Sequence, residues 1–121
     1  MSVRLCFLAA AAFAATASTT AVAQSPLQPH EQAIIAYIKE AAFDPDAVQI
    51  KFITPLHTAE MKRGIFAPRQ TYTWACASWN GKNRYGAYVG FSTDAFLFSD
   101  GKIIEMIDNG EFVANISICP R

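Results

Sequence analysis

Alternating residues broken by compact turn signals constrain the fold more than any other feature of this sequence. In the segment 71–79, Tyr72, Trp74 and Cys76 share one face, and threonine and alanine occupy the other. This period of two predicts a β-strand. Asn80-Gly81 and Asp100-Gly101 each predict a hairpin turn, because these residue types tolerate positive φ. The chain is therefore expected to fold back on itself as antiparallel strands, continued by residues 84–92, 94–99 and 102–107.

A helical pattern precedes the strands, in residues 29–43. Ile34, Tyr37 and Ile38 are spaced so that they form one apolar stripe. Asp44 precedes a proline, which disfavours helical geometry and ends the helix there. Residues 46–54 then alternate as a further strand, with Val48, Ile50 and Phe52 expected on one face.

Two segments have weaker patterns. Residues 56–70 show no period, and we expect an exposed connector. Residues 111–121 fit either a strand or a helix, and we favour a short helix tethered through Cys119.

One helix followed by strands with tight turns predicts the α+β class. We expect a single domain over residues 24–121, in which the helix packs on an antiparallel meander of about four strands. The predicted core combines aromatic residues of the strands with aliphatic residues of the helix: Phe52, Trp74, Phe91, Phe96, Phe98, Ile34 and Ile38.

The first 23 residues are typical of an export signal. Arg4 precedes an apolar run over residues 5–15, and Ala21-Val22-Ala23 forms a small-residue cleavage site before Gln24. The run is too short to span a bilayer. A buried helix or an uncleaved anchor is the alternative. We expect a periplasmic or secreted product without a membrane span in residues 24–121.

Two cysteines, Cys76 and Cys119, remain after such processing. An even number in a small exported domain predicts a disulfide, and only one pairing exists. A redox-active pair is the alternative, but the spacing is not C-x-x-C.

Charge and motifs exclude several functions. Removing Arg4 leaves nine basic and ten acidic residues, a net charge of about −1, which argues against a nucleic-acid-binding protein. The two histidines, His30 and His57, lack metal-ligand spacing, and no nucleotide-binding or hydrolase motif is present. We therefore predict no metal, no cofactor and no catalytic residues, although a His57–Glu60 pair is one alternative.

The glycine- and aromatic-rich segment 79–91 is the candidate binding site. Gly86 and Gly90 flank Tyr88, and basic residues lie near the turn. Such a hairpin either packs against its own domain or presents an aromatic and basic surface. The residues predicted to bind are Asn80, Lys82, Asn83, Arg84, Tyr85 and Tyr88.

The same segment resembles a pattern found in small exported bacterial proteins of unassigned function. These proteins carry Cys-Gly-x-Val-Asn-Ala-Lys-Asn, then two residues, then Gly-Gly-Tyr-x-Gly. The matching residues here are Cys76, Asn80, Lys82, Asn83, Gly86, Tyr88, Gly90 and Phe91, with Asp44-Pro45-Asp46 upstream and Cys119 downstream. The chain departs from the pattern at Ala77, Trp79, Gly81 and Ala87. The resemblance implies export, fold and disulfide, and it implies no reaction.

Two functions follow as expectations. The first is a non-enzymatic binding module that recognises a protein, peptide or glycan of the cell envelope. The second is an inhibitor of an envelope enzyme, or a small hydrolase. An inhibitor would use a protruding loop, either the connector 56–70 or the turn at Asn80.

Overall fold

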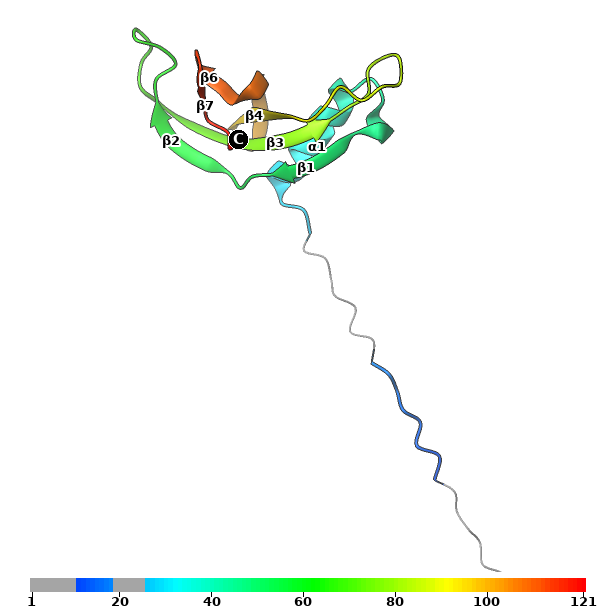
Figure 1. Ribbon diagram of the computed structural model, residues 1–121. Coiled ribbons are helices and arrows are strands. Elements are labelled where there is room, and N and C mark those ends of the chain that lie inside the picture. Colours follow the sequence, from blue (N-terminus) through cyan, green and yellow to red (C-terminus); the bar gives the residue numbers. More distant parts are fainter. Residues whose placement is uncertain (1–10, 19–25) are drawn as a thin grey trace, which may run out of the picture.

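The computed structural model describes residues 11–18 and 26–121, and the predicted export signal lies largely outside these residues. The domain is α+β, with one helix, a five-stranded antiparallel sheet and a small two-stranded sheet (Figure 1). The elements, in chain order, are α1 (Pro29–Ala41), a 3₁₀ turn (Pro45–Ala47), β1 (Gln49–Ile53), β2 (His57–Met61), β3 (Gln70–Asn80), β4 (Ser92–Ser99), β5 (Lys102–Ile107), a 3₁₀ turn (Asp108–Gly110), β6 (Glu111–Val113) and β7 (Ile116–Ser117).

β3 is the central strand of the sheet. It pairs with β4 on one side, and β5 pairs with β4 beyond it. On the other side β1 pairs with the second half of β3, and β2 pairs with its first half. The predicted antiparallel meander is therefore confirmed as the order β1-β3-β4-β5, with β2 as an additional strand. The predicted strand over residues 84–92 is wrong, because no strand lies between β3 and β4.

β2 lies in the segment that was predicted to be a connector, so that prediction is wrong. The strand was missed because its short sequence, HTAEM, alternates only weakly and is largely exposed at the sheet edge. Pro55 separates it from β1. Thr54 bridges the gap, since its N–H donates to the Cys76 carbonyl and its hydroxyl accepts from the Cys76 N–H, both at 2.8 Å.

α1 covers one face of the sheet. Ile34 and Ile38, one turn apart, are fully buried against Ala75, Phe96 and Phe98. This stripe is the one predicted from the sequence. Phe52 and Phe91 were also predicted for the core, but both are exposed.

A β-bulge explains the error at Phe52. The register of β1 on β3 shifts between Ile50 and Phe52, which adds one unpaired residue to β1. A bulge reverses the alternation beyond it. Ile53 therefore packs toward the helix, and Phe52 faces away from it.

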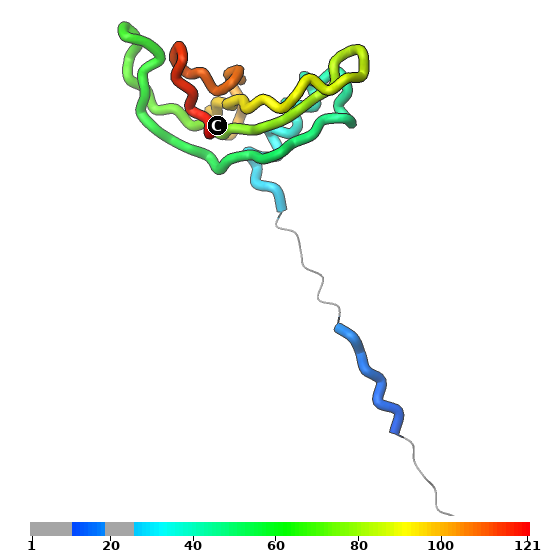
Figure 2. The backbone as a smooth tube through the Cα atoms, in the orientation of Figure 1, coloured from blue at the N-terminus to red at the C-terminus, as the bar shows by residue number. Residues whose placement is uncertain are grey.

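The C-terminal segment covers the other face of the sheet. Phe112 is buried against Trp74, Leu97 and Ile107. The predicted short helix is wrong, because residues 111–117 form the β6–β7 hairpin, with Asn115 at φ 64° between the strands. The sheet is curved, and β6 and β7 lie on the inner side of the crescent (Figure 2).

A disulfide between Cys76 and Cys119 fixes this segment to the central strand, as predicted, with a Cα–Cα distance of 5.8 Å. Gly110 lies against the bridge. A Cβ atom at this position would be 2.7 Å from the Cys119 sulfur, so only glycine fits.

We expect the Cys76→Ala/Cys119→Ala variant to be markedly less stable. The bond closes a 43-residue separation, for which the loop-entropy model gives about 4 kcal/mol. Urea unfolding of the two proteins measures the difference, and mass spectrometry of the wild type should show two hydrogens fewer than the reduced chain. Equal midpoints would contradict a structural role for the bridge.

Candidate functional site

The candidate binding segment forms a protruding loop of residues 81–91 between β3 and β4. The predicted two-residue turn at Asn80-Gly81 is wrong, since β3 runs to Asn80 and β4 begins only at Ser92. The chain instead reverses between Asn83 and Gly86, where the Gly86 N–H donates to the Asn83 carbonyl and Gly86 has φ 79°. Glycine is favoured at this backbone angle.

Asn83 organises the tip of loop 81–91. Its side-chain oxygen accepts hydrogen bonds from the N–H groups of Tyr85 and Ala87, at 2.9 and 3.1 Å. Its own N–H donates to the Ala87 carbonyl at 2.8 Å. One asparagine thus satisfies the backbone of a turn that has no regular strand pairing.

Asn80 organises the base of the same loop. Its side chain is only 7% exposed, and its oxygen accepts a hydrogen bond from the Gly90 N–H at 3.0 Å. Its amide nitrogen donates to the Gln49 side chain. Asn80 therefore lies beneath the loop, apart from the other predicted binding residues.

Two pairs of cationic and aromatic residues lie on the loop. The Arg84 guanidinium lies 4.9 Å from the Tyr85 ring centre, and the Lys82 amino group lies 5.2 Å from that of Tyr88. Tyr85 is 78% exposed. Tyr88 is partly covered, and its hydroxyl donates to the Ala47 carbonyl at 3.0 Å. The structure thus brings Lys82, Arg84, Tyr85 and Tyr88 together on one protrusion.

Loop 81–91 is convex. Three open hollows, of about 340, 440 and 290 Å³, lie on the described part of the chain, and none of the six predicted residues lines any of them. A protrusion of this shape is suited to entering a recess in a partner, whereas small ligands bind in concave sites.

A buried carboxylate supports the start of β4 below this loop. Asp94 accepts a hydrogen bond from the Trp79 indole N–H at 2.7 Å and from the Asn109 N–H at 2.9 Å. Both oxygens are thus used in joining β3, β4 and the turn before β6. Asp94 has a structural role in this arrangement.

The histidines also make structural contacts. His30 contacts the Thr54 carbonyl at 3.1 Å, and the His57 ring lies 5.6 Å from the Trp74 ring. His57 and Glu60 are three residues apart on β2, so their side chains point to opposite faces. In residues 11–18 and 26–121, no group of three potential metal-ligating side chains is close enough to hold an ion.

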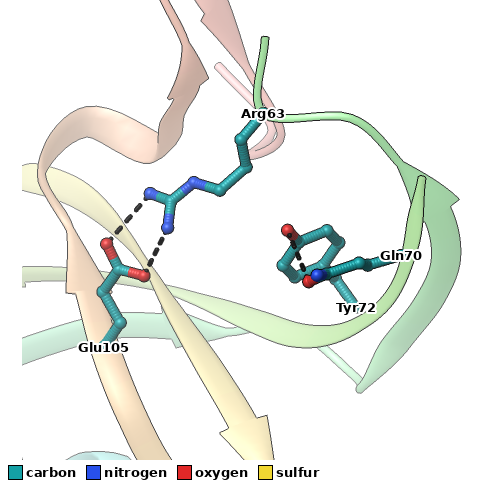
Figure 3. Close-up of polar contacts among 4 residues, drawn as sticks. All are labelled: Arg63, Gln70, Tyr72 and Glu105. Atoms are coloured by element: carbon teal, nitrogen blue, oxygen red, sulfur yellow. Dashed lines mark hydrogen bonds and ion pairs between the residues drawn. The ribbon is translucent and has the colours of Figure 1, made fainter. Parts of the chain in front are cut away.

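A second protruding loop, residues 62–69, joins β2 to β3. The base of this loop is fixed by an ion pair between Arg63 and Glu105 on β5. The Arg63 guanidinium donates two hydrogen bonds to the Glu105 carboxylate, at 2.7 and 2.9 Å (Figure 3). The Arg63 guanidinium also lies 5.1 Å from the Phe112 ring centre. Ile65 and Phe66 form the tip and are 89% and 100% exposed. Sequence reasoning did not single out these two residues, although two adjacent apolar residues in an aperiodic, basic segment are a detectable signal.

No protein-family model, curated protein or solved structure matches this chain. No helix of the described residues is long and apolar enough to cross a membrane.

We expect Asn83→Ala to loosen loop 81–91 while leaving the sheet intact. The substitution removes the acceptor of two backbone hydrogen bonds, each contributing about 1 kcal/mol. Amide hydrogen exchange at Tyr85 and Ala87 should accelerate, while exchange in β3 and β4 stays slow. An Arg84→Ala control should leave these amides protected. Unchanged exchange in Asn83→Ala would contradict this role of the side chain.

Acid should weaken the Arg63–Glu105 pair. The hydrogen bonds from Arg63 hold the pKa of Glu105 below its ordinary value of 4.5. The pair therefore stabilises the folded state fully above the ordinary pKa, and this contribution is lost as pH falls through the lower, folded-state value. Because both side chains are more than one-third exposed, we expect only about 0.5 kcal/mol. The melting temperatures of wild type and Glu105→Gln should differ at neutral pH and converge in acid. A constant difference would contradict the assignment.

Proposed function

We propose that this chain is an exported, non-enzymatic interaction module that binds a protein of the cell envelope through loop 81–91. One observation carries the proposal: hydrogen bonds to Asn83 and Asn80 hold the loop in one shape, while Arg84 and Tyr85 remain exposed. Tyrosine and arginine are enriched among the residues that dominate binding energy. A preformed loop also loses less conformational entropy on binding.

The disulfide supports the proposed location. Structural disulfides persist in oxidising compartments, which include the periplasm and the extracellular space. The bond joins Cys76, which is fully buried, to the C-terminal segment. This placement favours a structural role over a redox role, because reactive cysteines are accessible to their substrates.

The convex shape of loop 81–91 favours one class of partner. A protein with a recess can surround Tyr85 and desolvate the adjacent guanidinium. The same geometry supports inhibition of an envelope enzyme as a second candidate, since a protruding, preformed loop fits an active-site cleft. A hydrolase has less support, because both histidines are engaged in contacts within the domain.

The Arg84→Ala/Tyr85→Ala variant tests the proposal. Used as bait on an envelope extract, the wild type should retain a stoichiometric partner, and the variant should lose it. The melting temperature should stay close to that of the wild type, because neither side chain is buried. Tyr88→Ala is a poorer choice, since it would also remove the hydrogen bond to Ala47.

The matched control is Lys102→Ala/Ile104→Ala, which removes a cation and an exposed apolar side chain of β5, at the other end of the sheet from the loop. Retention of the partner by the loop variant would contradict the proposal, as would recovery of a glycan in place of a protein. A retained enzyme that loses activity in the complex would identify the inhibitor function.

A further inference from the structure

The tip of loop 62–69 exposes two apolar side chains that the fold leaves uncovered. The Ala67 N–H donates to the Gly64 carbonyl at 3.2 Å, which closes a β-turn with Ile65 and Phe66 as its central residues. The central residues of such a turn project away from the strands. Their near-complete exposure shows that neither belongs to the core.

The tip has a defined position relative to the sheet. The β2–β3 pairing extends to Met61 and Gln70, and Arg63 ties the loop to Glu105 on β5. The two apolar residues are thus held at one end of the crescent, at the opposite end of β3 from loop 81–91 (Figure 1).

The charge around the tip is positive. Residues 61–70 contain three basic residues, Lys62, Arg63 and Arg69, and no acidic residue, although Glu60 directly precedes them. Arg63 is neutralised by Glu105, which leaves Lys62 and Arg69 exposed on the two sides of the turn.

Extending the register of β2 on β3 by one residue would pair Lys62 with Arg69. They adjoin Met61 and Gln70, the last paired residues of β2 and β3, one step further into the loop on each strand. Like charges placed directly opposite in a hairpin repel each other. An anionic surface that contacts both side chains would turn this repulsion into attraction.

We propose that loop 62–69 docks the domain on an anionic phospholipid bilayer. Ile65 and Phe66 would enter the boundary between headgroups and acyl chains, and Lys62 and Arg69 would contact the lipid phosphates. Apolar residues flanked by cations are the composition that interfacial membrane binding uses, and the cations gain from the negative surface potential. Binding through two side chains is reversible. It leaves loop 81–91, at the other end of the sheet, able to contact a partner.

The test is sedimentation of the disulfide-intact full chain with vesicles. The wild type should bind vesicles of equal parts phosphatidylglycerol and phosphatidylcholine more tightly than vesicles of phosphatidylcholine alone. Ile65→Ser/Phe66→Ser should weaken binding roughly tenfold or more, because it removes both inserted apolar side chains. Lys62→Gln/Arg69→Gln should weaken it by roughly fivefold per cation. Rising salt should weaken wild-type binding as well.

Matched controls use the same residue types elsewhere on the surface. Ile104→Ser/Phe43→Ser removes one exposed isoleucine and one exposed phenylalanine, and Lys39→Gln/Arg121→Gln removes one lysine and one arginine. Both controls should bind as the wild type does. Because the N-terminal apolar run is common to all variants, a difference between the tip variants and their controls reports on the loop alone.

Insertion is measured directly with Phe66→Trp in vesicles that carry brominated acyl chains. The introduced indole should be quenched, whereas the wild type, in which Trp74 and Trp79 are packed against the sheet, gives the unquenched baseline. Absence of quenching in Phe66→Trp, or equal binding by the tip variants and their controls, would overturn the proposal.

Two further outcomes separate this proposal from its alternatives. Retention of a protein partner that depends on Phe66, without vesicle binding, would overturn it in favour of a protein pocket. The Arg84→Ala/Tyr85→Ala variant should still bind vesicles. The membrane proposal for loop 62–69 and the partner proposal for loop 81–91 are therefore tested independently of each other.

Discussion

The covalent link between Cys76 and Cys119 joins the C-terminal segment to the central strand and keeps the second face of the sheet covered. Cys76 lies in the middle of the central strand and is fully buried. Its partner holds the C-terminal hairpin over the face of the sheet that α1 does not cover, so the indole N–H of Trp74 reaches the Ile118 carbonyl and Phe112 fills the space beside it. A domain this small has a limited core, and covering both faces of one strand increases it.

We place the two proposed contact sites at the ends of the sheet as a consequence. Apolar side chains fill both faces of β3, whereas the loops that precede and follow it carry exposed apolar or aromatic residues and a shared excess of cations. The near-neutral charge of the whole chain hides this arrangement, because the acidic residues all lie outside the stretch from Met61 to Thr93. The two proposed sites are separated by the length of one strand, so one loop could contact a membrane surface while the other binds a partner.

The sequence predicted the elements in which local pattern and tertiary burial agree. The helical stripe of Ile34 and Ile38, the Asp100-Gly101 turn with both residues at positive φ, and the single possible disulfide were all identified. The errors arose where tertiary contacts decide the local structure. The bulge in β1 places Phe52 on the face of the sheet opposite to the one predicted. The side chain of Asn80 supports a long loop where a short turn was predicted. The binding residues predicted on that loop lie together except for Asn80, and the Ile65-Phe66 tip was missed because it belongs to no periodic element.

We propose that the end loops, and not the faces of the sheet, make contacts with other molecules. The most direct measurement is in vivo photo-crosslinking with a benzophenone amino acid placed singly at positions 66, 85, 43 and 104, each of which is exposed. We expect a protein adduct from position 85, a lipid adduct from position 66, and none from the other two. Adducts that form from positions 43 or 104, with none from either loop, would contradict it.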